Sequence, residues 1–203
     1  MKKQLTEIIF ILDRSGSMYP VINDTIGGFN STIEKQKNLE GECLVSTVLF
    51  NNYSKVLHDR VDIKEIKELT RKDYEVNGCT ALLDAIGDAI HHIKNVHKYI
   101  RDEDRPEKTL FIISTDGMEN ASRKYSYSDI KKLIENKQKE GWEFIFLGAN
   151  IDVYAEGRKY GLDESHICEY VQSEEGINLQ YERVNRAVSQ MRCKGKVDES
   201  WKD

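Results

Sequence analysis

The chain has 203 residues, a length that suits one α/β domain and leaves little for a second. Its formal net charge of -5, with Lys and Arg scattered among Asp and Glu, argues against a nucleic-acid role, which usually shows a basic stripe. No apolar run is long enough to span a bilayer, and the run behind Met1-Lys2-Lys3 is too short for a secretory signal, so we expect a cytoplasmic location and no membrane partner.

The cysteines are few and far apart in the sequence. No Cys-x-x-Cys pair occurs, so a zinc site is not predicted. A disulfide framework is not expected in a chain of this size with so few cysteines. We expect reduced thiols at Cys43, Cys79, Cys168 and Cys193.

Strand and helix patterns alternate through the first half of the chain. Residues 8–12 form a continuous apolar run, typical of a strand buried on both faces. Apolar residues then recur at helical spacing over residues 22–33. Residues 44–50 are rich in β-branched side chains and predict a strand, with residues 55–61 as its hairpin partner. A second long helix is predicted over residues 82–96.

The alternation continues in the second half. Buried strands are predicted at residues 110–114, 144–147 and 167–171. Between the first two we predict a helix that starts at a Ser128 cap and stops near Gly141.

Two more helices complete the pattern, a short one over residues 153–160 and a final one over residues 177–191. The remaining residues, 192–203, are polar and are predicted to fray. We therefore predict a single domain over residues 1–203 with its core at about residues 6–191.

This order of elements predicts the α/β class. The expected fold is doubly wound, with a mostly parallel central sheet, helices on both faces and one antiparallel edge strand. Connections between parallel strands should be right-handed.

Three predicted loops at the carboxyl ends of strands carry oxygen-bearing side chains, and ligands bind at this edge of open α/β sheets. Residues 13–17 read Asp-Arg-Ser-Gly-Ser, residues 78–80 read Gly-Cys-Thr, and residues 115–117 read Thr-Asp-Gly. Hard divalent cations such as Mg²⁺ take oxygen ligands. The candidate metal ligands are Asp13, Ser15, Ser17, Thr80 and Asp116.

Each loop taken alone has a simpler interpretation. The acid and hydroxyls of residues 13–17 could cap the next helix, and Thr80 could be an ordinary N-cap. Asp116 could belong to a turn. The coincidence of all three loops, each at a strand-to-helix junction, favours the metal site.

The three motifs, in this order, resemble the metal-ion-dependent adhesion site of von Willebrand factor A (vWA) domains of the bacterial or intracellular type. The resemblance implies that Ser15 and Ser17 bind Mg²⁺, or Mn²⁺ or Ca²⁺, directly. It implies that Thr80 binds directly or through water. Asp13 and Asp116 would act mostly through water and by hydrogen-bonding the serines.

The resemblance also implies a function without catalysis. A cation held mainly by neutral hydroxyls stays electron-poor and keeps an open position, which an Asp or Glu of a partner protein would fill. One alternative is a metal-dependent phosphoryl-transfer hydrolase, although Ser15 stands where a haloacid-dehalogenase-type phosphatase has its second Asp. A metal-free scaffold is the other. Cys79 departs from the family pattern, which often has a second glycine there.

Two groups of side chains near these loops have uncertain roles. Tyr125 and Tyr127 follow the third loop and are hypothesised to be aromatic anchors at the partner surface. His91, His92 and His97 contain no pair at i, i+4, so we expect a solvated or partly packed helix face and not a zinc site.

Overall fold

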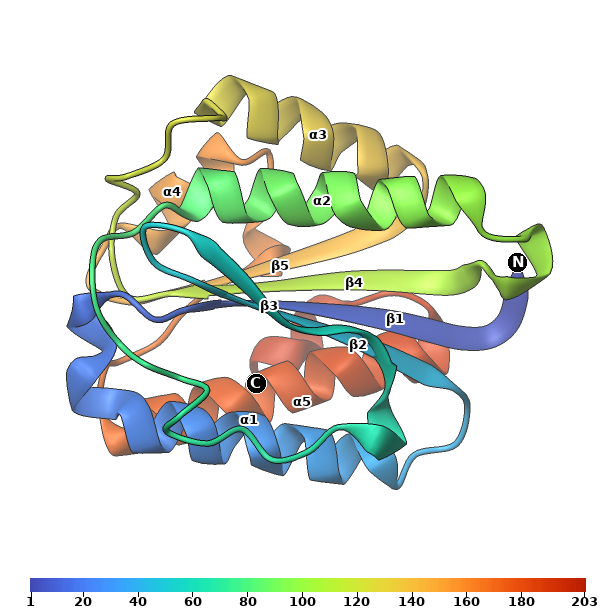
Figure 1. Ribbon diagram of the computed structural model, residues 1–203, viewed down its shortest axis with the longest axis horizontal. Helices are drawn as coiled ribbons and strands as arrows, with labels where there is room; N and C mark the ends of the chain where they lie inside the picture. The colour runs from blue at the N-terminus through green and yellow to red at the C-terminus, as the bar shows by residue number, and fades with distance from the viewer.

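A six-stranded sheet forms the middle layer of the computed structural model, which describes residues 1–203 (Figure 1). The strands lie in the order β3-β2-β1-β4-β5-β6. All pairs are parallel except β2 with β3, which confirms the predicted fold class. The strands are β1 (Lys2–Asp13), β2 (Cys43–Phe50), β3 (Ser54–Asp62), β4 (Pro106–Thr115), β5 (Trp142–Gly148) and β6 (Ile167–Glu169).

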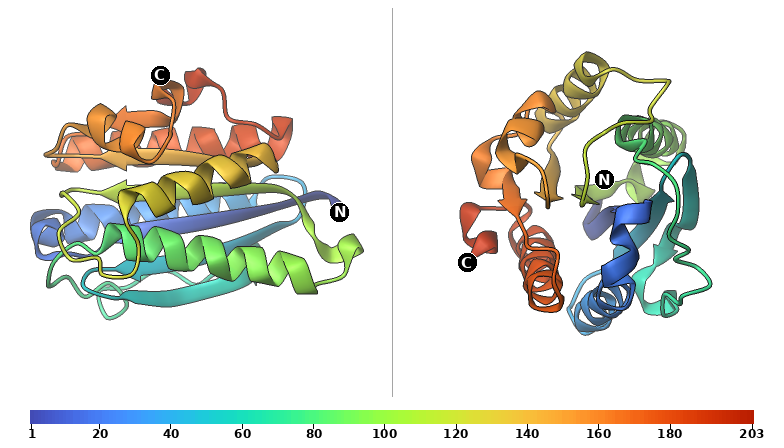
Figure 2. Two further views of the ribbon diagram at one scale, coloured as in Figure 1. Left: turned by 90° about the horizontal axis from the view of Figure 1, so that it is seen from above. Right: turned by 90° about the vertical axis from the view of Figure 1, so that its left-hand side faces the viewer.

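Helices cover both faces of the sheet, as Figure 2 shows from two further sides. On one face lie α1 (Ile22–Lys37) and α5 (Glu174–Lys194). On the other lie α2 (Leu82–Tyr99), α3 (Tyr127–Lys139) and α4 (Val153–Lys159). None of these helices is both long and apolar enough to cross a membrane.

Alternate side chains of β1 supply the two cores. Ile8, Phe10 and Leu12 belong to the core shared with α1 and α5, whereas Ile9 and Ile11 belong to the core shared with α2 and α3. A strand with helices on both faces must be apolar at every position, which is why this run is continuous.

The sheet reverses its winding between β1 and β4. From β1 the chain moves outward to β2 and β3, then crosses through α2 to β4 on the opposite side of β1. In register, Leu12 of β1 lies beside Ser114 of β4, so the carboxyl ends of these two strands open at the same edge. Such a reversal leaves a crevice at the strand ends, where ligands bind in folds of this class.

The two borders of the sheet are irregular. Along β3 the register with β2 shifts twice, and Arg60 adopts a left-handed backbone with φ of 53°. Its amide nitrogen bonds the Ser46 hydroxyl at 3.0 Å instead of continuing the ladder. The opposite border, β6, has three residues.

Two predicted boundaries were wrong. The cap of α3 is Ser126, because its hydroxyl accepts the Asp129 amide while the Asp129 carboxylate accepts the Ser126 amide; Ser128 lies inside the helix. Strand β6 ends at Glu169 instead of residue 171, because the chain turns there toward the cap of α5 at Ser173.

The polar tail does not fray. Helix α5 runs to Lys194, and Gly195 ends it in a left-handed conformation. A short 3-10 turn, Glu199–Lys202, then buries Trp201 completely, and its indole nitrogen donates to the Ser165 carbonyl at 2.8 Å. One buried tryptophan with a partnered N–H outweighs the polar composition of the segment.

The helix face predicted to be solvated or partly packed is partly packed, and His97 is its buried position. His97 is buried and pairs with Glu7 of β1, which also accepts a hydrogen bond from Arg60. A carboxylate without exposed surface is costly unless it is paired and hydrogen-bonded, so the Arg60 guanidinium compensates the charge of Glu7 and His97 occupies its second oxygen. His92, in contrast, is exposed and pairs with Asp59.

Candidate metal centre

Asp13 ends β1 with both carboxylate oxygens hydrogen-bonded. Its Oδ1 accepts the Ser15 amide at 2.7 Å, and its Oδ2 accepts the Thr115 hydroxyl at 2.6 Å. The residue is 1% exposed. The carboxylate therefore ties the first loop to the end of β4.

The hydroxyls of the first loop lead from Asp13 toward Asp116. Ser15 Oγ lies 3.1 Å from Ser17 Oγ, and Ser17 Oγ donates to Asp116 Oδ1 at 2.6 Å. Ser15 is buried and Ser17 is exposed, so the row of oxygens runs from the interior to the surface.

Thr80 faces the same space from the second loop. A methyl group placed on Gly117 would lie 3.7 Å from Thr80 Oγ1 and 3.9 Å from Ser17 Oγ. Gly117 thus leaves room between two hydroxyls from distant parts of the chain. The structure brings all five predicted side chains to one edge of the sheet.

Backbone contacts hold the three loops against each other. The Gly16 amide donates to the Gly78 carbonyl at 3.0 Å. The Thr80 amide donates to Asn120 Oδ1 at 2.9 Å, and the Asn120 amide returns a bond to the Thr80 carbonyl at 3.0 Å. Gly78 has φ of +76°, and a Cβ there would lie 2.1 Å from Asn52 Oδ1, so glycine is required.

Sequence reasoning missed Gln172, which lies between β6 and α5. Its amide nitrogen donates to Asp116 Oδ2 at 2.6 Å and to the Ser17 carbonyl at 2.8 Å. It also missed two buried tyrosines: Tyr74 donates to the Asp13 carbonyl, and Tyr170 donates to the Thr115 carbonyl at 3.1 Å. The signal available for Gln172 was its position after the last strand, at the same edge.

The two tyrosines proposed as aromatic anchors make contacts within the fold. The Tyr125 ring packs over Gly87 of α2, where a Cβ would lie 2.5 Å from the ring. Tyr127 donates its hydroxyl to Glu156 at 2.6 Å and stacks on Tyr160. Both rings are half-buried and pack between helices, so these contacts hold them in place, and their role at a partner surface stays a prediction.

Burial works against the negative charge of both acids. It raises the pKa of Asp13 to about 6, although the hydrogen bonds from Thr115 and Ser15 act in the opposite direction. Burial also raises the pKa of Asp116, against hydrogen bonds from Ser17 and Gln172. A divalent cation would stabilise the charged form of both carboxylates.

The donor set fits a hard cation. Hydroxyl and carboxylate oxygens are the ligands of Mg²⁺ and Mn²⁺. No group of three or more His, Cys, Asp or Glu side chains that could hold a metal ion occurs in the structure. A metal here would therefore depend on the hydroxyls of Ser15, Ser17 and Thr80 as well as on two carboxylates.

Comparison with solved structures shows the class of fold. PTMP1, the proximal thread matrix protein of the mussel byssus, matches with a TM-score of 0.60 at 15% identity, over 89% of this chain and 45% of PTMP1. It has also been solved with a zinc-occupied MIDAS motif, the metal-ion-dependent adhesion site. A von Willebrand factor type A protein from Catenulispora acidiphila matches with a TM-score of 0.57 at 16% sequence identity, over 89% of this chain and 41% of that one.

The vWF domain of the type V pili tip protein Mfa5 from Porphyromonas gingivalis matches with a TM-score of 0.64 at 9% identity, over 96% of this chain and 98% of that one. The present fold is therefore that of a vWA domain. The chain spans less than half of PTMP1 and of the Catenulispora protein. No protein-family model matches the sequence, and no curated protein matches it.

Proposed function

We propose that this chain is a divalent-metal-dependent protein-binding module. In this proposal Mg²⁺ lies at the carboxyl ends of β1 and β4 and accepts a carboxylate from a partner protein. One observation carries it, a continuous row of three oxygen atoms next to the Thr80 hydroxyl. Ser15 Oγ lies 3.1 Å from Ser17 Oγ, which lies 2.6 Å from Asp116 Oδ1.

In this proposal some residues bind the cation directly and others act on it indirectly. Ser15, Ser17 and Thr80 would supply neutral oxygens to the ion, while Asp13 and Asp116 balance part of its charge. Because three of the five donors are neutral, the ion would keep an affinity for an outside anion. Ser17 is exposed, so a partner could reach the ion from solvent. The zinc-occupied motif of PTMP1 supports a metal at this edge of the fold.

We infer that the site binds without catalysis. Hydrolysis at a serine needs a base within hydrogen-bond reach of the hydroxyl. The histidines are engaged elsewhere in the fold, where His58 contacts Thr47, His97 contacts Glu7 and His166 contacts Glu143. The carboxylate that does accept a serine hydroxyl, Asp116 from Ser17, is assigned in this proposal to the cation. A generic aryl phosphate assay would favour the hydrolase alternative if turnover required metal and disappeared in Asp13→Asn.

Calorimetry tests metal binding directly. Chelator-treated protein should bind Mg²⁺ or Mn²⁺ with measurable heat, and Ser15→Ala and Asp116→Ala should abolish the signal. Ser128→Ala, a matched change on the exposed surface of α3, should bind normally. The absence of heat in the wild type, or equal binding by all variants, would remove the basis of the proposal and favour the metal-free scaffold.

A blocked peptide tests the open position. With saturating Mg²⁺, a peptide that contains one Asp between glycines should shift the amide resonances of residues 15–17 and 116–117, and chelator should reverse the shift. The same peptide with Asn in place of Asp is the control. Equal shifts by both peptides would contradict binding through a carboxylate.

A further inference from the structure

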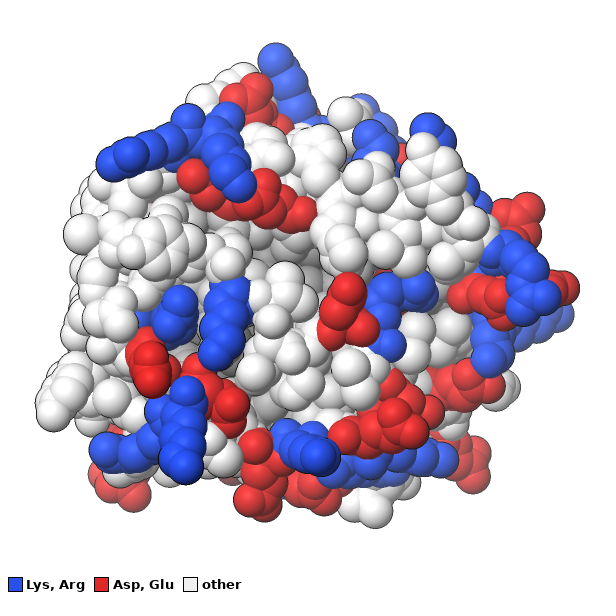
Figure 3. Space-filling view, in the orientation of Figure 1, with Lys and Arg blue, Asp and Glu red and all other residues white.

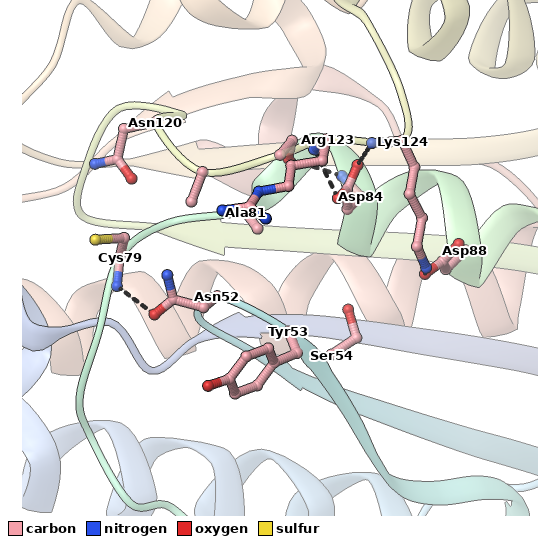
Figure 4. Close-up of a pocket in the computed structure, with 12 residues that line it drawn as sticks. Asn52, Tyr53, Ser54, Cys79, Ala81, Asp84, Asp88, Asn120, Arg123 and Lys124 are labelled. Atoms are coloured by element: carbon pink, nitrogen blue, oxygen red, sulfur yellow. Dashed lines mark hydrogen bonds and ion pairs between the residues drawn. The ribbon is translucent and has the colours of Figure 1, made fainter.

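We propose that a pocket beside the metal site binds a second acidic side chain of the same partner, and that Arg123 recognises it. This inference rests on the proposed function and specifies the class of partner, a protein segment with two closely spaced acidic residues. The pocket has a volume of about 940 Å³ and appears in close-up in Figure 4.

The pocket adjoins the metal loops directly. It lies between the turn that joins β2 to β3, the loop that leads into α2, and the loop of residues 120–124. Two of its lining residues, Cys79 and Asn120, flank the candidate ligand Thr80; Asn120 Oδ1 accepts the Thr80 amide at 2.9 Å. The pocket therefore lies beside the place where a partner's carboxylate would reach the ion.

The acids that line the pocket are already satisfied. The Asp84 carboxylate accepts the amides of three consecutive residues, 123–125, at 2.9, 2.9 and 3.1 Å. Asp88 accepts the Lys124 ammonium at 2.6 Å. These contacts satisfy the hydrogen bonding of both carboxylates and of the lysine, although Asp84 keeps its negative charge because its donors are neutral amides.

Arg123 is the charged group of the pocket that has no partner. Its guanidinium takes part in no ion pair or hydrogen bond of the structure, whereas its amide is fixed by Asp84. In Figure 4 its side chain reaches over the pocket toward Ala81. The formal charges of the pocket sum to zero, but Arg123 is its one charged side chain without a hydrogen-bond or ion-pair partner. The planar guanidinium suits a carboxylate.

The remaining polar groups of the wall suit an anion as well. Asn52 uses its carbonyl oxygen to accept the Cys79 amide at 3.0 Å, which leaves its NH₂ group free to donate. Tyr53 is 72% exposed, and the hydroxyls of Tyr53 and Ser54 make no hydrogen bond within the protein. Free donors together with an unpaired guanidinium favour a carboxylate over a cationic or apolar group.

The face around the pocket carries charges of both signs. In Figure 3 the Lys and Arg side chains are interspersed with Asp and Glu, and neither sign forms a continuous patch on this face. Recognition of the second acid should therefore be local to Arg123 and not a general attraction of anions.

Blocked peptides of graded charge test the inference on the full chain with saturating Mg²⁺. One contains a single Asp, one contains two adjacent Asp residues, and one contains two Asp residues separated by Gly. NMR titration should show tighter binding of at least one two-acid peptide, by about three- to five-fold, the range of an exposed ion pair. Arg123→Gln should remove this advantage and leave the affinities for Mg²⁺ and for the single-Asp peptide unchanged.

Arg101→Gln is the matched control. It makes the same change of net charge beyond the other end of α2, where Arg101 pairs with Glu103 and Asp104, so the advantage of two acids should persist. If the two-acid peptides bind no tighter than the single-Asp peptide, or if Arg123→Gln keeps the advantage, the role of Arg123 is overturned while the metal site stands. If wild type binds no Mg²⁺, the proposed function itself fails.

Discussion

Asp116 is held from two sides by groups that lie far apart in the sequence. The Ser17 hydroxyl fixes one of its oxygens and the Gln172 amide fixes the other. Gln172 is in turn held by Asn150, whose amide nitrogen donates to Gln172 Oε1 at 2.8 Å. Donors around a ligating carboxylate set its orientation, so Gln172 should act on the metal without touching it.

Replacing Gln172 with Ala should therefore weaken Mg²⁺ binding by about ten-fold, the lower end of the range for residues that orient metal ligands. Calorimetry on chelator-treated protein measures the change. Asn150→Gly is the control for a smaller effect. It removes the hydrogen bond from Asn150 to Gln172 but leaves the two bonds that Gln172 donates to Asp116 and Ser17. Glycine tolerates the φ of 59° at position 150. A loss in Asn150→Gly as large as that in Gln172→Ala would contradict the proposed order of effects.

At the scale of elements, α1 contains two adjacent glycines in opposite environments. A Cβ on Gly28 would lie 2.1 Å from the Tyr181 ring of α5, whereas a Cβ on Gly27 would meet nothing within 4 Å. The close contact between α1 and α5 thus depends on Gly28 and not on its neighbour.

This pair gives a prediction with its own control. Gly28→Ala should lower the free energy of unfolding by about 1–3 kcal/mol through overpacking. Gly27→Ala should raise it by about 0.5–1 kcal/mol, because alanine loses less conformational entropy in a helix. Urea unfolding followed by circular dichroism measures both. Equal changes in the two variants would show that α1 and α5 do not pack as described.

The C-terminal turn provides a second prediction at this scale. Trp201→Ala should lower the free energy of unfolding by about 3–5 kcal/mol, because it empties a buried site and removes the bond to the Ser165 carbonyl. Lys196→Ala, an exposed position in the same segment, should change it by less than about 0.5 kcal/mol. Urea unfolding again gives the values. If Trp201→Ala is as stable as Lys196→Ala, the turn does not contribute to the core.

The elements were predictable where periodicity was strong. The continuous apolar run at residues 8–12 gave β1, and the alternation of strands and helices gave the layers. The C-terminal turn was not predictable, because a single tryptophan in a polar segment gives no repeated spacing of apolar residues from which to infer an element. Ser128 was predicted as the cap of α3, and it is the reciprocal bond with Asp129, which the sequence pattern did not reveal, that places the cap at Ser126.

The candidate site was predictable to the extent that its residues sit in motifs at strand ends. Asp13, Ser15 and Asp116 belong to such motifs, and the structure places them together. Gln172 and Arg123 belong to none. Their positions depend on how the loops after β6 and β4 fold back, and a single sequence does not specify that.

At the scale of the whole molecule, we expect the proposed metal site to couple metal binding to the stability of the fold. Asp13 has a pKa of about 6 in the folded chain against an ordinary value of 3.8. A carboxyl group whose pKa is raised on folding stabilises the fold when protonated and loses that contribution as pH rises from about 4 to 6. Without metal, ionised Asp13 should therefore cost about 2–3 kcal/mol of folding free energy at neutral pH.

Mg²⁺ should reverse this cost, because the cation favours the ionised carboxylate. We expect the increase in melting temperature on adding saturating Mg²⁺ to be larger at pH 7.5 than at pH 5. Differential scanning calorimetry at the two pH values measures both increases. In Asp13→Asn the residue cannot ionise. Without metal, the melting temperature of this variant should therefore fall less than that of the wild type as pH rises from about 4 to 6. An equal Mg²⁺ effect at both pH values in the wild type would contradict the link.

The irregular edge strands, β3 and β6, determine whether a further strand can pair with the sheet. The shifted register and left-handed Arg60 of β3 bend one border, and β6 is too short to serve as a template at the other. Capture of an extended peptide as a seventh strand, and aggregation by edge-to-edge stacking of copies, are both disfavoured. If the proposed function holds, we expect a partner to be selected through its side chains at the end of the sheet, with no demand for an extended backbone.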